Sequence, residues 1–145
     1  MITIRKSQEA DRQIIEQLAV ASAEAIHLDK KLERMIKTIG QVELLVAEVD
    51  GQLGGFMYAY FKAPGDMPQA GNDELHISAI VVHPDHRRQG VASSLIQSIM
   101  GKTDKPITTH IDIDNTKAIS LFASLGFKII HTDAERVTME FKVSE

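Results

Sequence analysis

The spacing of apolar positions along the chain predicts an alternation of strands and helices. Apolar residues at every second position indicate half-buried strands, as at Ile2 and Ile4, and apolar residues three or four apart indicate helices, as at Ile14 and Leu18. These patterns predict strands at 2–5, 42–49, 53–61, 74–82, 107–113, 127–130 and 137–143, and helices at 14–26, 32–39, 91–100 and 116–125. The order β-α-α-β-β-β-α-β-α-β-β is typical of a mixed, mostly antiparallel α/β sheet of about seven strands with flanking helices.

Glycine and proline mark the connections between these elements. Asp50-Gly51 predicts a hairpin turn, and Gly54-Gly55 predicts a bulge in the strand that follows. Residues 63–73 are rich in proline and glycine and are expected to form a loop. Because hairpins dominate the middle of the chain, the pattern does not predict a doubly wound parallel sheet.

Composition limits the classes of protein that fit. The chain has 145 residues, of which 43% are hydrophobic and 25% charged, so we expect one globular domain over residues 1–145. A net charge of −4 argues against a nucleic-acid partner, and no apolar run reaches the roughly 18 residues of a membrane span. The chain has no cysteine, which excludes disulfides and thiolate catalysis. Without an apolar leader, the expected location is cytoplasmic.

Residues 80–93 contain the most specific local pattern. An apolar strand end, Pro84, Arg87, Arg88 and Gly90 lead into the predicted helix at 91–100. Amides at a helix start lack intrahelical acceptors and lie at the positive end of the helix dipole, so such a turn can bind a phosphate. A dinucleotide fingerprint needs three glycines and a nucleotide P-loop needs Gly-Lys-Ser/Thr, and the segment has neither. The spacing alone leaves two interpretations, a pyrophosphate site and a plain capped helix.

The same residues resemble a known family. Residues 87–92 match the (Gln/Arg)-x-x-Gly-x-(Gly/Ala) loop of the GCN5-related N-acetyltransferases, the GNAT family. Upstream, residues 80–84 resemble that family's central strand, and residues 115–127 resemble its Asn-x-x-Ala-x-x-Leu-Tyr-x-x-Leu-Gly-Phe segment. The resemblance implies a single GNAT domain over residues 1–145 with splayed central strands. It also implies an enzyme that moves an acetyl group from acetyl-CoA to a primary amine.

By this resemblance, the loop and the strand before it bind the acetyl-CoA co-substrate. Amides of residues 88–92 and the Ser93 hydroxyl would hold the pyrophosphate, with a salt bridge from Arg87 or Arg88. The backbone of residues 80–82 would pair with pantetheine, and its amides would stabilise the oxyanion. The expected cofactor-binding residues are Ile80, Val81, Val82, Arg87, Arg88, Gln89, Gly90, Val91, Ala92, Ser93, Asn115 and Phe122.

The last two of these residues have a second interpretation or depart from the family pattern. Asn115 would contact the pantetheine arm, cap the following helix, or do both. Phe122 stands where much of the family has the tyrosine that protonates the leaving thiolate, and phenylalanine has no proton to give. We expect Phe122 to pack beside the cofactor thiol, which leaves the proton source open.

Three residues are candidates for the general base, acting directly or through water. Glu74 and His76 share one face of the predicted strand 74–82, and His110 shares a face with Asp112 on strand 107–113. His76 falls where several family members carry a catalytic glutamate, and His110 at a position that some relatives use for a base. A histidine, with an ordinary pKa of about 6.5, suits proton transfer near neutrality. The alternative for each residue is a surface or packing role. The histidines lack metal-ligand spacing, so no metal is expected.

The acceptor is not specified by these motifs. It is expected to be a small-molecule amine, a peptide N-terminus or a lysine, with residues 25–40 and 63–73 forming the acceptor pocket. A second hypothesis is a non-catalytic acyl-CoA-binding or regulatory module, which Phe122 favours. A homodimer is possible, because the C-terminal strands offer an edge for pairing.

Overall fold

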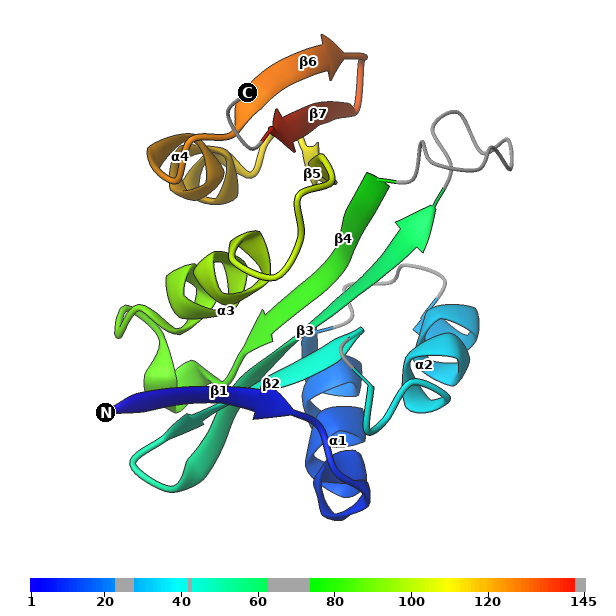
Figure 1. Cartoon of the computed structure of the whole chain (residues 1–145), viewed down its shortest axis with the longest axis vertical. Coiled ribbons are helices and arrows are strands. Elements are labelled where there is room, and N and C mark those ends of the chain that lie inside the picture. The colour runs from blue at the N-terminus through cyan, green and yellow to red at the C-terminus, as the bar shows by residue number, and fades with distance from the viewer. Residues whose placement is uncertain (23–27, 42, 63–73, 143–145) are drawn as a thin grey trace. The chain divides into compact units, whose positions relative to one another are not determined.

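The computed structural model describes residues 1–22, 28–41, 43–62 and 74–142 of the chain (Figure 1). Its strands are β1 (Ile2–Lys6), β2 (Leu44–Val49), β3 (Gln52–Lys62), β4 (Glu74–Val82), β5 (Ile107–Asp112), β6 (Lys128–Thr132) and β7 (Arg136–Phe141). Its helices are α1 (Arg12–Ser22), α2 (Leu28–Ile36), α3 (Val91–Met100) and α4 (Thr116–Ser124), with short 3-10 turns η1 (Glu9–Asp11) and η3 (Pro84–His86). All of the predicted strands and helices are present in the predicted order, and the predicted positions 23–26, 42 and 143 lie outside the described residues.

The strands form one seven-stranded sheet in the order β1-β2-β3-β4-β5-β7-β6. β4 and β5 pair in parallel, whereas the β1–β2, β2–β3, β5–β7 and β6–β7 ladders are antiparallel. This confirms the predicted mixed, mostly antiparallel sheet. The parallel ladder joins residues 75–77 to residues 107–109, although β4 continues to Val82 and β5 to Asp112. The splaying of the central strands beyond this ladder stays a prediction.

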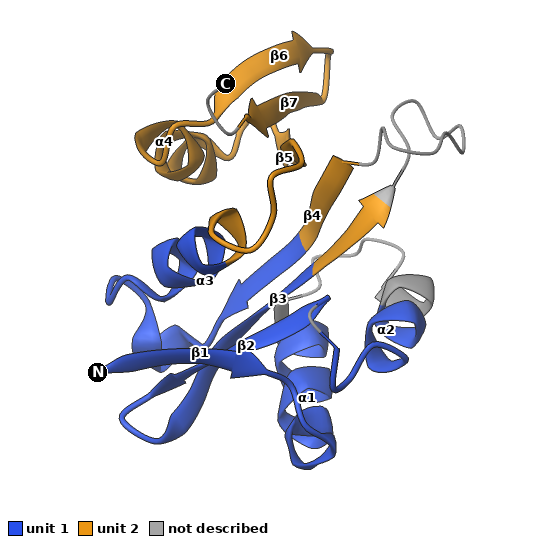
Figure 2. Cartoon of the chain, in the orientation of Figure 1, with its two compact units in different colours: residues 1–58, 79–98 blue, residues 59–78, 99–145 orange. Residues whose placement is uncertain are grey.

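The chain forms two compact units, which Figure 2 colours separately. Unit 1 comprises residues 1–58 and 79–98, and unit 2 comprises residues 59–78 and 99–145. β3, β4 and α3 each contribute residues to both units.

Each unit buries the apolar positions that the sequence pattern predicts. In unit 1, α1 packs beside α2 and buries Ile15, Leu18 and Ala19, which are spaced three and four residues apart along one face. In unit 2, Phe122 of α4 and Met139 of β7 are buried. Burying a side chain of this size stabilises the fold by about 1.5–3 kcal/mol, so the periodic positions account for much of each core.

Two adjacent glycines shape β3 within unit 1. Ala47 pairs with Gly55 and Glu48 with Leu53, so Gly54 is the extra residue of a bulge, as predicted. A Cβ on Gly55 would lie 2.7 Å from the Val81 carbonyl oxygen and 3.1 Å from a methyl carbon of Val91. The absence of a side chain at position 55 therefore lets β3 approach the end of β4 and the start of α3.

The acceptor-pocket prediction is only partly covered by the structure. Residues 25–27 and 63–73 lie outside the described residues, whereas residues 28–36 form α2 and the chain turns at Gly40, with a φ of +90°. Among the helices in the described ranges, none is long and apolar enough to cross a membrane.

Candidate active site

The connection from β4 to α3 is held against β3. The His83 amide donates to the Gly54 carbonyl over 2.8 Å, which ties the end of β4 to the bulge. The Asp85 amide then donates to His83 Nδ1 over 3.0 Å inside η3, whose proline occupies the first turn. The ring of His86 lies 3.4 Å from the Cβ position of Gly54. The loop that follows therefore starts from a defined point of unit 1.

The backbone after η3 has the geometry of an anion-binding turn. Arg88 and Gly90 adopt positive φ values of +66° and +84°, and α3 begins at the next residue, Val91. The first helical bond runs from the Ser94 amide to the Gly90 carbonyl over 3.0 Å. The amides of residues 91–93 precede that bond, so they have no acceptor within the helix. Their N–H groups lie at the positive end of the α3 dipole.

The side chains around this turn fit a phosphate group. Arg87, Arg88 and Gln89 are exposed, and a Cβ on Gly90 would meet no atom within 4 Å. The two guanidinium groups and the helix-start amides favour binding of an anion. The absence of a side chain at Gly90 leaves room for it beside the backbone. The residues present are thus suited to the pyrophosphate of acetyl-CoA. The binding role of residues 87–93 stays a prediction.

The strand segment predicted to pair with pantetheine is half-buried. Ile80, Val81 and Val82 keep part of their surface exposed at the end of β4, whereas Leu75 and Ile77 near its start are buried. Residues 80–82 lie beyond the three positions at which β4 pairs with β5. That pairing pattern is compatible with the predicted backbone contact to pantetheine, which stays a prediction.

Asn115 and Phe122 both belong to unit 2, and each has a structural role. Asn115 Oδ1 accepts a hydrogen bond from the Ala118 amide over 3.2 Å, so Asn115 is the N-cap of α4. Phe122 is 5% exposed and packs edge-to-face on Phe127 at 4.9 Å between ring centroids. Phe127 in turn packs on Phe141. The N-cap interpretation of Asn115 is confirmed, and the contacts of both residues with acetyl-CoA stay predictions.

Unit 2 brings the three candidate bases together. His76 and Thr108 are directly paired across the β4–β5 ladder, and His76 Nδ1 lies 3.1 Å from Thr108 Oγ1. The Thr108 hydroxyl donates to Glu74 Oε2. The ring of His110 lies 4.9 Å from that of His76, and the ring of Tyr60 lies 5.7 Å from it. The sequence proposed Glu74, His76 and His110 as alternatives, whereas the structure places them in one cluster.

Burial divides this cluster into an inner and an outer part. His76 is 6% exposed and Thr108 is 4% exposed, whereas His110 is exposed. His110 Nδ1 lies 2.9 Å from Thr138 Oγ1, which comes from β7. Sequence reasoning did not select Thr108, Tyr60 or Thr138. The alternation of β5, which puts Thr108 and His110 on one face, was the signal that could have found Thr108.

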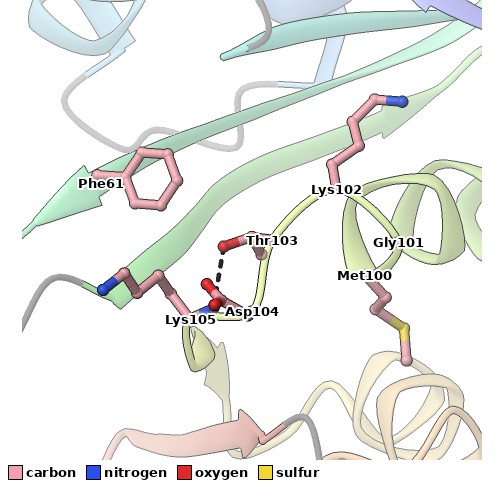
Figure 3. A pocket seen from close by; sticks show the side chains of 7 residues that line it. All are labelled: Phe61, Met100, Gly101, Lys102, Thr103, Asp104 and Lys105. Carbon is pink, nitrogen blue, oxygen red and sulfur yellow. Dashed lines mark hydrogen bonds between the residues drawn. The ribbon is translucent and has the colours of Figure 1, made fainter.

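A separate hollow lies at the turn between α3 and β5 (Figure 3). The Lys105 amide donates to Thr103 Oγ1 over 3.0 Å and closes that turn. The residues that line the hollow are Phe61, Met100, Gly101, Lys102, Thr103, Asp104 and Lys105. None of the predicted site residues lines it, so it is not part of the candidate active site. Within the described ranges, no three His, Cys, Asp or Glu residues are grouped as metal ligands.

The chain is similar to known proteins in sequence and in fold. Mycothiol acetyltransferase of Mycolicibacterium vanbaalenii is 29% identical over 102 residues, which are 68% of this chain and 31% of that protein. The chain thus spans about a third of the length of that relative. The structure of Arabidopsis thaliana NAA60 in complex with acetyl-CoA has the same fold, with a TM-score of 0.82 and 15% identity over 99% of this chain and 100% of that chain. Arabidopsis thaliana Naa50 in complex with the bisubstrate analogue CoA-Ac-MVNAL has a TM-score of 0.77 and 15% identity, covering 98% and 99% of the two chains.

The family model extends over both motif regions. Residues 12–127 match the acetyltransferase (GNAT) family, a range that includes the turn before α3 and the segment around Asn115 and Phe122. Because this match covers most of the sequence, the chain belongs to the acetyltransferase (GNAT) family.

Proposed function

We propose that the chain, acting as a single domain over residues 1–145, is an N-acetyltransferase that uses acetyl-CoA and a primary amine. The observation that carries the proposal is the turn at residues 87–93. Its exposed arginines and helix-start amides are the kinds of group that bind a pyrophosphate such as that of acetyl-CoA. Family membership and the similarity to acetyl-CoA-bound NAA60 support the same donor. The neutral amine nitrogen adds to the thioester carbonyl, the C–S bond breaks, and the nitrogen loses one proton, so that an amide, CoA thiolate and a proton result.

The cluster in unit 2 supplies the proton acceptor in this proposal. A primary ammonium must lose a proton before its nitrogen can attack. A base within reach of that proton raises the reaction rate by roughly 10²–10⁴-fold. His76 takes this proton, because it is buried and contacts Thr108, Tyr60 and His110. His110, which is exposed, and Glu74 act on His76 or on a bridging water rather than as separate bases.

The leaving thiolate needs a proton that Phe122 does not supply. In this proposal the proton that His76 takes from the ammonium is the one that later reaches the thiolate, directly or through water. No further proton donor is required, because the ammonium loses two protons in all, one before attack and one from its nitrogen after addition. One of them ends on the CoA thiol and the other is released to solvent. The acceptor is a small-molecule amine or a peptide amine. The peptide class is supported by the fold shared with Naa50, which is known in complex with a peptide-containing bisubstrate analogue.

The test is acceptor-dependent release of free CoA thiol across a panel of polyamines, aminoglycosides and peptides. The chain has no cysteine, so a thiol reagent reports only the CoA product. Turnover that needs both acetyl-CoA and an amine is the expected result. It should fall in His76→Ala, with smaller losses in Glu74→Gln and His110→Ala. Wild-type turnover in His76→Ala would overturn the base assignment.

A second candidate function is a non-catalytic acyl-CoA-binding module, which the replacement of the family's tyrosine by Phe122 favours. The same panel separates the two candidates. A chain that binds CoA yet releases no thiol with any amine is a binding module.

A further inference from the structure

We propose that Thr108 is a positioning residue that holds His76 in the tautomer with its hydrogen on Nδ1 and its lone pair on Nε2. This inference rests on the proposed function only for its catalytic consequence, because the tautomer itself is a property of the isolated chain. No motif of the sequence pointed to Thr108. Its position in the fold and its two hydrogen bonds do.

The tautomer follows from counting hydrogens. A threonine hydroxyl has one hydrogen to donate, and Thr108 donates it to the Glu74 carboxylate. The Thr108 oxygen can therefore only accept in its second contact, the 3.1 Å contact with His76 Nδ1. A neutral imidazole that donates from Nδ1 carries its lone pair on Nε2. Nε2 is then the atom of His76 that accepts the ammonium proton.

The backbone makes this arrangement hard to avoid. His76 and Thr108 are direct partners in the parallel β4–β5 ladder, so their side chains lie on one face of the sheet. Glu74 precedes His76 by two positions on the same strand and shares that face. The neighbouring pair, Ile77 and Thr109, points to the opposite face, where the Thr109 hydroxyl donates to the Ile77 carbonyl over 3.1 Å.

The chain of contacts also stabilises the product of proton transfer. When His76 becomes an imidazolium, its Nδ1–H still donates to Thr108, whose hydroxyl dipole leads to the negative charge of Glu74. The ring of His110 faces His76 from β5 and that of Tyr60 faces it from β3.

The variant that tests the proposal is Thr108→Val, which keeps the shape of the side chain and removes the hydroxyl. Thr108→Ser restores the hydroxyl. Thr109→Val is the matched control, because Thr109 is equally buried at 4% exposure on the same strand and its hydroxyl donates to the Ile77 backbone carbonyl on the other face. Nitrogen NMR of the His76 ring in the CoA-free protein reads the tautomer without any acceptor. Steady-state kinetics over pH read its consequence.

The expected result is that wild type, Thr108→Ser and Thr109→Val carry the hydrogen on Nδ1, whereas Thr108→Val shows a mixture or the other tautomer. With an active acceptor, Thr108→Val should lose roughly 10²-fold in kcat, as general-base catalysis is impaired, with an unchanged KM for acetyl-CoA. The acid limb of its kcat profile should also shift. Serine should rescue both readouts.

Two outcomes would overturn the proposal: a wild-type His76 with its hydrogen on Nε2, or a Thr108→Val tautomer identical to that of wild type. An equal kcat loss in Thr109→Val would make the kinetic effect structural and would equally count against it. If no amine supports turnover in wild type, the proposed function fails instead. The NMR comparison still decides the tautomer in that case.

Discussion

Gly90→Glu is the substitution that most directly tests the donor site. Gly90 has a φ of +84°, which costs any residue with a Cβ about 1–2 kcal/mol. A Cβ there would meet nothing within 4 Å, so the protein itself offers no further steric objection. The loss of folding stability should therefore stay near that backbone cost. Any larger effect must come from what binds at the turn.

The electrostatic cost to a bound pyrophosphate is the larger quantity. Two unit charges about 4 Å apart interact with about 1 kcal/mol in bulk water and about 4 kcal/mol near a protein surface. Repulsion of this size raises the Kd for CoA by about 5-fold to 1000-fold, since each 1.4 kcal/mol is a factor of ten. The turn at Gly90 is exposed, which favours the lower half of this range at physiological salt. We expect a loss of at least about 5-fold, and a smaller loss at high salt.

The assay is calorimetric titration of CoA with wild type, Gly90→Glu and Gly40→Glu, beside urea unfolding of all three. Gly40 is the matched control, because its φ is +90° and its Cβ position is also open. It lies after α2, outside the turn that precedes α3. Both variants should lose similar stability, and only Gly90→Glu should lose affinity. A Gly90→Glu protein that binds CoA as tightly as wild type would refute the assignment of the turn.

Three further substitutions test the unit cores and the cluster. Gly55→Ala puts a Cβ 2.7 Å from a β4 carbonyl oxygen, so urea unfolding should show a loss of about 1–3 kcal/mol, with a raised Kd for CoA in calorimetry. Hydrogen bonds from Arg5 lower the pKa of Asp11 in the folded state. The ionised Asp11 carboxylate therefore stabilises the fold above the unfolded-state pKa of about 3.9, and this stabilisation is lost as the pH falls below that value. Asp11→Asn should cost about 2–3 kcal/mol at pH 7 and less at pH 3 in urea unfolding, and an equal cost at both would refute this. Thr108→Val removes the hydroxyl that contacts a buried ring nitrogen of His76, so urea unfolding should show a loss of about 1–3 kcal/mol that Thr108→Ser recovers.

The elements that the sequence predicted best are those with an uninterrupted local signal. β4 and α3 have their predicted bounds. A dense apolar run defines β4, and α3 lies between Gly90 and Gly101. The Gly54 bulge was also predictable, since two adjacent glycines in a strand favour one. α2 begins earlier than its apolar positions suggested, because polar residues such as Asp29 occupy its first turn. The spacing of apolar residues gives no signal for a helical turn that is made of polar residues.

The arrangement of the candidate bases was not predictable in the same way. Local alternation put Glu74 with His76 on one strand and His110 on another, but it does not specify which β5 residue stands opposite His76. The β4–β5 register sets that partner, and it selects Thr108 over its neighbour Thr109. Register in a parallel pair depends on the whole crossover through α3. The sequence therefore identified the residue types but not the order in which they bond.

The turn at residues 87–93 and the histidine cluster depend on the sequence in different ways. The turn uses backbone amides and a glycine φ, so a short motif suffices to specify it. The cluster buries His76 and Thr108 beside a carboxylate, and burying such groups costs free energy unless each one is hydrogen-bonded. Apolar residues of similar volume would satisfy the core of unit 2 without that requirement. A buried polar arrangement that the fold does not need for stability is a physical reason to place the proton chemistry there.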